Sequence, residues 1–262
     1  MTDQTNIAGS HRPRFFSREF LRQTGIFWAL VIISGVMALS QPAFLTGPNL
    51  TNILKQISIN GILAVGMSIV LISGGIDLSV GSILAVSCVF SAHFAQVDVA
   101  YPLIVPLMVA ISVGALLGAI NGFGIAYIGF APFIMTLAMM TMARGFVLLV
   151  TNARPVFNLS RPFINVANQF SLGMPNLVWY FAAVWIIGFL VLKTTVFGKW
   201  IYAVGGNESA ARLSGIKVRR VKLIVYVISG AFAGFAGMLL ASRITSGNPR
   251  VGDQYELDAI AA

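Results

Sequence analysis

Apolar segments of membrane-spanning length recur along almost the whole chain. The candidates are residues 25–39, 57–73, 78–95, 101–118, 132–150, 176–192 and 223–241. A helix needs about 20 predominantly apolar residues to cross the hydrocarbon core of a bilayer. No stretch alternates apolar and polar residues over a length that would suggest a membrane barrel. The pattern predicts an all-α, polytopic membrane protein with about seven transmembrane helices.

The composition and charge support a membrane protein. Hydrophobic residues make up 57% of the 262 residues and charged residues only 10%, whereas a soluble domain carries about 25% charged residues. The net charge of +9 does not indicate nucleic-acid binding, because the basic residues lie at the ends of apolar segments and form no stripe with aromatic residues. The single cysteine, Cys88, excludes an internal disulfide and a cysteine-based metal site.

The positions of the basic residues predict the orientation. One cluster lies in the tail 1–24 and the other in the loop 193–222, and a count of seven spans places both on the same side. Cytoplasmic loops carry the excess of Lys and Arg. We therefore expect a cytoplasmic N-terminal tail at 1–24, a transmembrane permease domain at 25–262, and a cytoplasmic loop at 193–222 within it.

The loop 193–222 contains a short predicted helix. Asn207 can cap it, Glu208 in its first turn complements the helix dipole, and Gly215 can end it. Ala210 and Ala211 would leave a small, smooth face that suits docking into a groove of a partner. The alternative is an ordinary basic connector.

Three segments resemble one known family. They are "GILAVGMSIVLISGGIDLSVGS", "YAVGGNESAARLSGIKV" and the terminal "YELDAIAA". Together they resemble the membrane subunits of ribose-type ATP-binding-cassette (ABC) sugar importers, and the resemblance runs from about Phe15 to Ala262.

The resemblance implies a function and a set of partners. It implies a permease subunit that carries a monosaccharide, such as ribose, across the bacterial inner membrane. The implied partners are a second permease subunit, ABC ATPase subunits that couple through the loop helix 208–215, and a periplasmic sugar-binding protein. The implied fold is larger, with roughly ten membrane helices, so we expect this chain to be incomplete at its C-terminus.

The stretch "ISGGIDLSVGS" places a carboxylate between two apolar segments, and two interpretations are open. In the first, Gly74 and Gly75 end one helix, and Asp77 caps the next by accepting the backbone N–H of Ser79 or Val80. In the second, the chain breaks inside the membrane, and Asp77 and Ser79 line a solute path. The cap needs fewer assumptions, and the two interpretations are compatible.

Enzymatic activity is not expected. The chain has no phosphate-binding GxxxxGK[ST] loop and no catalytic group of nucleophile, base and orienting residue, and no cofactor is expected. The main alternative function is an ion-coupled secondary transporter of a small polar solute, for which Asp77 is the only candidate for an intramembrane coupling acid. Arg144 is expected to snorkel or pair inside the bundle, and Asn60 and Asn121 are expected to bond between helices.

Overall fold

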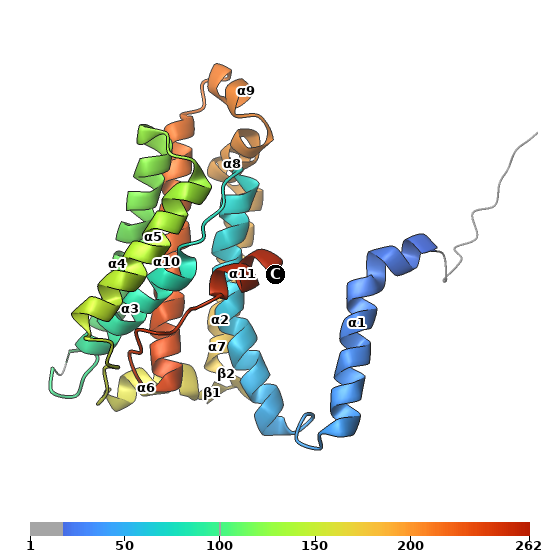
Figure 1. The fold of residues 1–262 in the computed structure, drawn as a ribbon, viewed down its shortest axis with the longest axis vertical. Helices are drawn as coiled ribbons and strands as arrows, with labels where there is room; N and C mark the ends of the chain where they lie inside the picture. Colours follow the sequence, from blue (N-terminus) through green and yellow to red (C-terminus); the bar gives the residue numbers. More distant parts are fainter. Residues whose placement is uncertain (1–17, 100) are drawn as a thin grey trace, which may run out of the picture. The chain divides into compact units, whose positions relative to one another are not determined.

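The structure is a computed structural model that describes residues 18–99 and 101–262, and this part of the chain is almost entirely helical (Figure 1). It divides into two compact units, Met1–Leu50 and Thr51–Ala262, called unit 1 and unit 2. Unit 1 contains α1 (Arg18–Ser40) and the beginning of α2 (Gly47–Ile72). Most of the predicted basic tail, 1–24, lies outside the described residues.

Unit 2 is a bundle of helices with one small hairpin. After α2, its elements are α3 (Val80–Phe94), α4 (Ile104–Phe123), the π-helix Gly124–Ile128, α5 (Pro132–Val150), α6 (Arg161–Asn168), β1 (Phe170–Ser171), β2 (Met174–Pro175), α7 (Asn176–Thr194), α8 (Val196–Gly206), α9 (Glu208–Leu213), α10 (Val218–Ile244) and α11 (Tyr255–Ala261). The strands β1 and β2 pair antiparallel.

Each of the seven predicted spans coincides with a helix. Among the described residues, α2, α4 with its π-helical extension, α5, α7 and α10 are long and apolar enough to cross a membrane. The apolar part of α1 and the whole of α3 are shorter. The prediction of an all-α, multi-pass membrane protein is therefore confirmed, and five of the seven segments reach full spanning length.

Helix α10 forms the centre of unit 2 and packs most extensively against α4 and α3. Glycines allow the close approach of α4 and α10: a Cβ on Gly114 would collide with the Gly230 carbonyl oxygen, and a Cβ on Gly118 with the Tyr226 carbonyl oxygen. Small residues repeated every four positions are the usual basis of tight helix packing in membranes, where lipid tails remove the hydrophobic drive for association.

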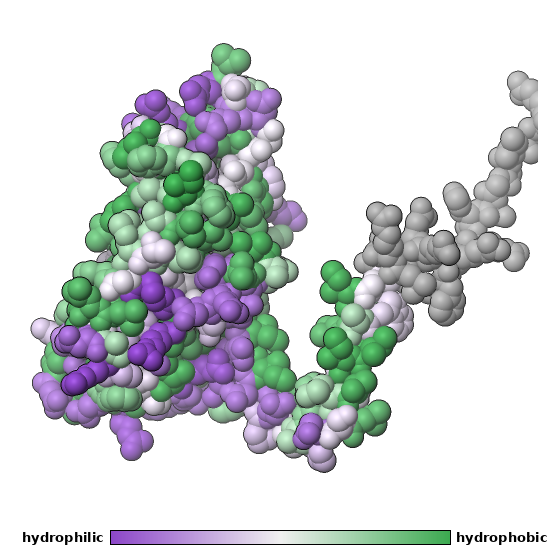
Figure 2. Space-filling view, viewed as in Figure 1, coloured by the Kyte–Doolittle hydropathy of each residue, from purple (hydrophilic) through white to green (hydrophobic). Residues whose placement is uncertain are grey.

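The two ends of unit 2 differ. Helices α8 and α9 lie at one end, and α6 with the β1–β2 hairpin lies at the other (Figure 1); we call these the α9 end and the α6 end. Figure 2 shows a largely hydrophobic surface between more hydrophilic ends. A helical protein embedded in a bilayer has this distribution, because lipid tails cover the apolar band.

Candidate functional site

Helix α9 has the ends that the sequence predicts. The Oδ1 atom of Asn207 accepts a hydrogen bond from the backbone N–H of Ala210 at 3.0 Å, which caps the first turn. The helix ends at Leu213, and Gly215 follows with φ of +83°. The Ile216 N–H reaches back to the Ala211 carbonyl oxygen at 3.1 Å, as in a glycine-terminated helix. The predicted helix 208–215 therefore ends two residues early.

Glu208 fastens α9 to the start of α10. Its carboxylate is 2.6 Å from Nζ of Lys222 and 3.0 Å from Nη2 of Arg212. The hydrogen bond from Lys222, more than any other contact, lowers the pKa of the Glu208 carboxyl below its ordinary value. The sequence predicted only a contact with the helix dipole; in the structure, the ion pair with Lys222 also ties α9 to α10, whereas the pair with Arg212 lies within α9.

The two alanines of α9 have different surroundings. Ala211 is only 4% exposed and belongs to an apolar cluster that includes Val204, Val218 and Val221. Ala210 is exposed. A helix of six residues is too short to be stable alone, so one of its faces must pack against the bundle. Ala211 supplies that face, and the surface open to a partner is formed by Ala210 and its exposed neighbours.

Leu213, which was not among the predicted site residues, is the most exposed large hydrophobic side chain of α8 and α9. It is the last residue of α9 and is 90% exposed. Figure 2 shows hydrophobic surface at this tip, above hydrophilic surface. The available signal was a leucine between the polar residues Arg212 and Ser214. A large apolar side chain at the far end of a charged loop is suited to an apolar pocket of a partner.

The break between α2 and α3 is held by α10. Gly74 has φ of +82°, a conformation that glycine adopts readily. A Cβ on Gly75 would lie 2.5 Å from the hydroxyl oxygen of Tyr226, so glycine is also required for packing there. The Tyr226 hydroxyl donates to the Ile76 carbonyl oxygen at 3.2 Å. A backbone carbonyl outside a helix thereby gains a partner.

Asp77 is fully buried and hydrogen-bonded on both oxygens. Its Oδ1 accepts from the Ser79 backbone N–H at 3.0 Å and from the Ser79 hydroxyl at 2.6 Å. Its Oδ2 accepts from the Ser229 hydroxyl at 3.0 Å. Asn121 of α4 donates to the Ser79 hydroxyl oxygen at 2.8 Å, in agreement with the predicted interhelical bond. The carboxylate thus holds the turn at Ser79, the residue that immediately precedes α3, and through Ser79 and Ser229 it links the beginning of α3 to α4 and α10.

The break lies well inside the bundle. Ser229 is eleven residues beyond Val218, the first residue of α10, which corresponds to about 16 Å at 1.5 Å per residue. Helix α3 has only 15 residues, fewer than the roughly 20 that cross a bilayer. The contact between Asp77 and Ser79 therefore occurs at a break that lies along the length of α10, and the two interpretations of the break are geometrically compatible.

The end of α8, just before α9, contacts the break between α2 and α3. A Cβ on Gly205, at the end of α8, would collide with the Ile72 carbonyl oxygen at the end of α2. A Cβ on Gly74 would lie 3.7 Å from the Cα of Gly205. Only the link residue Asn207 and one glycine separate Gly205 from α9. The end of α8, next to α9 in the chain, therefore lies against the last turn of α2 and against the break.

A second irregular segment turns back into the bundle after α10. Arg144 of α5 donates from Nη1 to the carbonyl oxygens of Pro249 and Val251, at 3.1 and 2.7 Å, and its Nη2 lies 2.7 Å from Oδ1 of Asp253. The prediction that Arg144 pairs inside the bundle is thus confirmed. Irregular backbone at membrane depth needs partners of this kind for its polar groups.

The returning segment carries acidic residues that the sequence analysis did not place among the helices. Glu256 lies beside Gly81 near the beginning of α3. Asp258 accepts a hydrogen bond from Nδ2 of Asn60, in the middle of α2, at 3.1 Å. Asp77 is therefore not the only acid that contacts these helices, but Glu256 and Asp258 belong to the short helix α11 and not to a predicted span. These acids follow the last long apolar run in the sequence, and only the turn of the chain brings them alongside α2 and α3.

Comparison with known protein families assigns this chain to a family. Residues 49–262 match the family model described as "Branched-chain amino acid transport system / permease component". The chain belongs to this permease family. As a permease component, it is a membrane-spanning transport subunit and not an enzyme.

The permease is similar to sugar importers along almost its whole length. It is 39% identical to the ribose import permease protein RbsC of Escherichia coli strain K12, over 100% of this chain and 81% of that protein. It is 38% identical to RbsC of Haemophilus influenzae, over 93% of this chain and 76% of that protein. It is 36% identical to the galactose/methyl galactoside import permease protein MglC of Haemophilus influenzae, over 94% of this chain and 78% of that protein. No solved structure matches the permease.

Within the described residues, the permease has no group of three or more His, Cys, Asp or Glu side chains placed to hold a metal ion. Three other features stand out. The first is helix α9, which is capped by Asn207 and ends in the exposed Leu213. The others are the hydrogen-bonded break between α2 and α3, about 16 Å along α10, and the segment after α10 that Arg144 holds. These features suit mechanical coupling and solute passage.

Proposed function

We propose that the permease is the membrane-spanning subunit of an ABC importer that carries a monosaccharide, such as ribose, across the bacterial inner membrane. Similarity to the ribose and galactose import permeases supports this substrate class. We further propose that it works with a second permease subunit, with ABC ATPase subunits, and with a periplasmic sugar-binding protein that delivers the solute.

In the proposed orientation, the α9 end and the N-terminus lie in the cytoplasm. Four basic residues follow α9 closely, at Lys217, Arg219, Arg220 and Lys222, and the tail before α1 is also basic. An excess of Lys and Arg is typical of cytoplasmic loops. The ATPase subunits, which use cytoplasmic ATP, would then meet α9.

The observation that carries the proposal is the exposure of Leu213 on a capped helix that adjoins the break. Leu213 would insert into the ATPase, with Asn207, Glu208, Ala210, Ala211 and Gly215 holding or flanking the docking surface. Movement of the ATPase would pass through Gly205 to the Ile72 end of α2 and then to Gly74 and Gly75. Asp77 and Ser79 would keep α3 aligned with α10 during this movement.

An ion-coupled secondary transporter is the alternative. Such a protein would couple solute movement to an intramembrane acid, and α9 with its exposed leucine would have no role. Asp77 already accepts three hydrogen bonds and is fully buried. In the proposed importer, Asp77 therefore has a structural role and not the role of an ion-coupling acid.

A co-purification experiment tests the docking step. Leu213→Ser should abolish co-purification of the ATPase subunit, because it removes an apolar anchor without disturbing the buried core. Leu172→Ser is a matched control, since Leu172 is also 90% exposed but lies in the hairpin turn at the α6 end. Wild-type retention of the ATPase by the Leu213 variant would exclude α9 as its docking site. ATP-dependent uptake of ribose into proteoliposomes, compared with uptake driven by an ion gradient, separates the two functions.

A further inference from the structure

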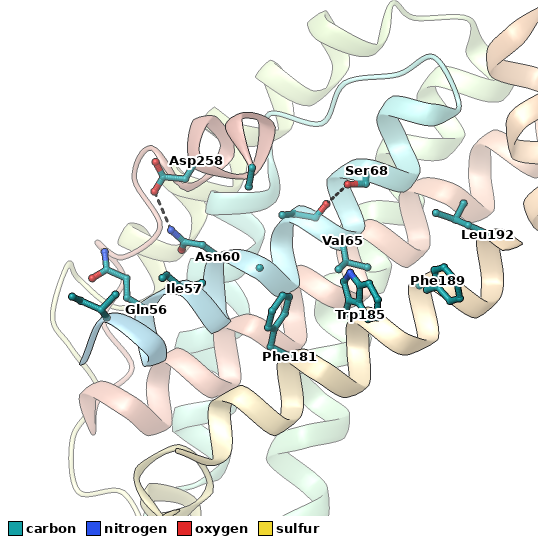
Figure 3. Close-up of a pocket in the computed structure, with 15 residues that line it drawn as sticks. Gln56, Ile57, Asn60, Val65, Ser68, Phe181, Trp185, Phe189, Leu192 and Asp258 are labelled. Atoms are coloured by element: carbon teal, nitrogen blue, oxygen red, sulfur yellow. Dashed lines mark hydrogen bonds between the residues drawn. The ribbon is translucent and has the colours of Figure 1, made fainter. Parts of the chain in front are cut away.

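A groove of about 680 Å³ runs between α2 and α7, with α11 at one edge (Figure 3). Gln56, Asn60 and Ser68 line it from α2, at positions separated by multiples of four. Residues at such spacing lie on one face of a helix. The α2 wall therefore presents a row of two amides and a hydroxyl.

The opposite wall of the groove is aromatic. Phe181, Trp185 and Phe189 line it from α7, again at intervals of four residues (Figure 3). The two rows thus face a common space, one able to hydrogen-bond and the other presenting ring surfaces.

Two glycines hold the rows at a fixed distance. A Cβ on Gly61 of α2 would lie 2.5 Å from the ring of Phe181, and a Cβ on Gly188 of α7 would lie 2.5 Å from Cγ1 of Val65. Each helix thus has a glycine where a side chain of the other helix packs. These contacts form the floor of the groove, and its walls are accordingly rigid.

The polar row lies at a depth where lipid would be an unfavourable neighbour. Positions 56–68 occupy the middle of α2, and positions 181–189 the middle of α7. Asp258 adds a carboxylate to the α2 side, and the Oδ1 atom of Asn60 is buried without a hydrogen-bond partner among the described residues. Polar and charged groups at this depth normally face water, solute or protein, because hydrocarbon cannot hydrogen-bond them.

We propose that this groove binds a small, uncharged, polyhydroxylated solute and is part of the track along which the permease moves it. Amide groups donate and accept hydrogen bonds, a carboxylate accepts them, and a hydroxyl does both. These are the partners that a ring of solute hydroxyls requires. The aromatic row offers π-faces to the solute's C–H face. The identification of the solute as a monosaccharide rests on the proposed function.

The charge of the groove argues against an amino-acid solute. Among the described residues that line it, Asp258 has the only ionisable side chain. An amino acid would bring a carboxylate into a site that has no cationic side chain to receive it. A neutral solute requires no such partner, since its hydroxyls can be satisfied by Gln56, Asn60, Ser68 and Asp258.

Thiol labelling of the complete importer in lipid nanodiscs tests whether the groove is hydrated and binds sugar. Ser68→Cys should react with a small, charged, water-soluble methanethiosulfonate reagent at least about tenfold faster than Ile187→Cys. Ile187 is the matched control, because it is exposed in the middle of α7 but does not line the groove. The native Cys88 is buried and sets the background. Ribose, L-arabinose or galactose should slow labelling of Ser68→Cys, whereas L-leucine and NaCl should not.

Transport kinetics supply a second readout. Trp185→Ala should raise the KM for sugar uptake by about tenfold, as expected for the loss of one aromatic contact, while ATPase co-purification stays unchanged. Trp185→Phe should restore most of the loss, and Ile187→Ala should have no effect. Unchanged KM for Trp185→Ala would overturn the proposal.

The labelling outcomes separate this proposal from the proposed function. Equal labelling of Ser68→Cys and Ile187→Cys, protection by L-leucine alone, or no protection by any of the three sugars would overturn the groove as a sugar site. If the wild-type importer still takes up a monosaccharide in that case, the proposed function stands. If the wild type transports none of the three sugars under ATP, the proposed function itself fails.

Discussion

Ser229 of α10 donates its hydroxyl hydrogen to Oδ2 of Asp77 at an Oγ–Oδ2 distance of 3.0 Å, across 152 positions of sequence. The same carboxylate accepts the backbone N–H and the hydroxyl of Ser79, the residue that immediately precedes α3. One buried acid therefore ties the turn before α3 to α10. This contact fixes the internal break that divides the apolar stretch from α2 to α3.

Removing this contact should destabilise the permease. Ser229→Ala leaves the buried Asp77 with one hydrogen bond fewer, and we expect a loss of about 1–3 kcal/mol of stability. Ser87→Ala is the control, because Ser87 is fully buried but its hydroxyl has no partner among the described residues. Thermal unfolding in nanodiscs should show a lower midpoint for Ser229→Ala only. Equal midpoints for the two variants would show that the Asp77 contact contributes nothing measurable.

Loss of the Arg144 side chain should release the segment that follows α10. Arg144→Gln removes the donor to the Pro249 carbonyl and the salt bridge to Asp253. We expect hydrogen exchange in 245–254 to accelerate by about tenfold, equivalent to about 1.4 kcal/mol. Arg250→Gln, an exposed change in the same segment, should leave exchange unchanged. If both variants exchange at the wild-type rate, Arg144 does not hold the segment.

A methyl group at Gly205 should interfere with the transmission from α9 to the break. Gly205→Ala places a Cβ against the Ile72 carbonyl oxygen and must separate α8 from α2. ATP-dependent uptake should fall by about tenfold, within the usual range of coupling between sites, while ATPase co-purification persists. Gly206→Ala is the neighbouring control, since nothing lies within 4 Å of a Cβ there. Normal uptake by Gly205→Ala would contradict this route.

The attachment of α9 to α10 should weaken in acid. The pKa of Glu208 lies below its ordinary value of 4.5, so its ion pairs contribute fully above that value and are lost as the pH falls through the lowered pKa. The effect should be small, because the Glu208 side chain is 41% exposed and exposed pairs contribute about 0.2–1 kcal/mol. The protection factors of residues 210–216, which divide the intrinsic by the observed exchange rate and so correct for the intrinsic pH dependence of amide exchange, should fall below about pH 4.5 in the wild type. In Glu208→Gln they should already be lowered at pH 7 and should change little with pH. Identical protection profiles for the two proteins would exclude the ion pair as the cause.

The sequence by itself determined the features that depend on neighbouring residues. The seven apolar segments predicted the helices, because membrane-spanning length and apolarity are properties of a continuous stretch. The Asn207 cap and the hydrogen bond from Ser79 to Asp77 each join residues at most three positions apart. The end of α9 at Gly215 depends on the backbone freedom of that one glycine. These interactions form within single turns of the chain and need no knowledge of packing.

Only the tertiary structure decided which faces meet. The sequence placed Ala211 on an open face, but packing against Val218 and Val221 buries it and leaves Leu213 exposed. Likewise, nothing in "YELDAIAA" indicates that Asp258 meets Asn60, 198 positions earlier. In a membrane, apolar side chains are satisfied by lipid as well as by protein, so hydrophobicity does not select a helix's partner face. Steric fit at glycines such as Gly114 and Gly230, together with hydrogen bonds between buried polar groups, makes that selection.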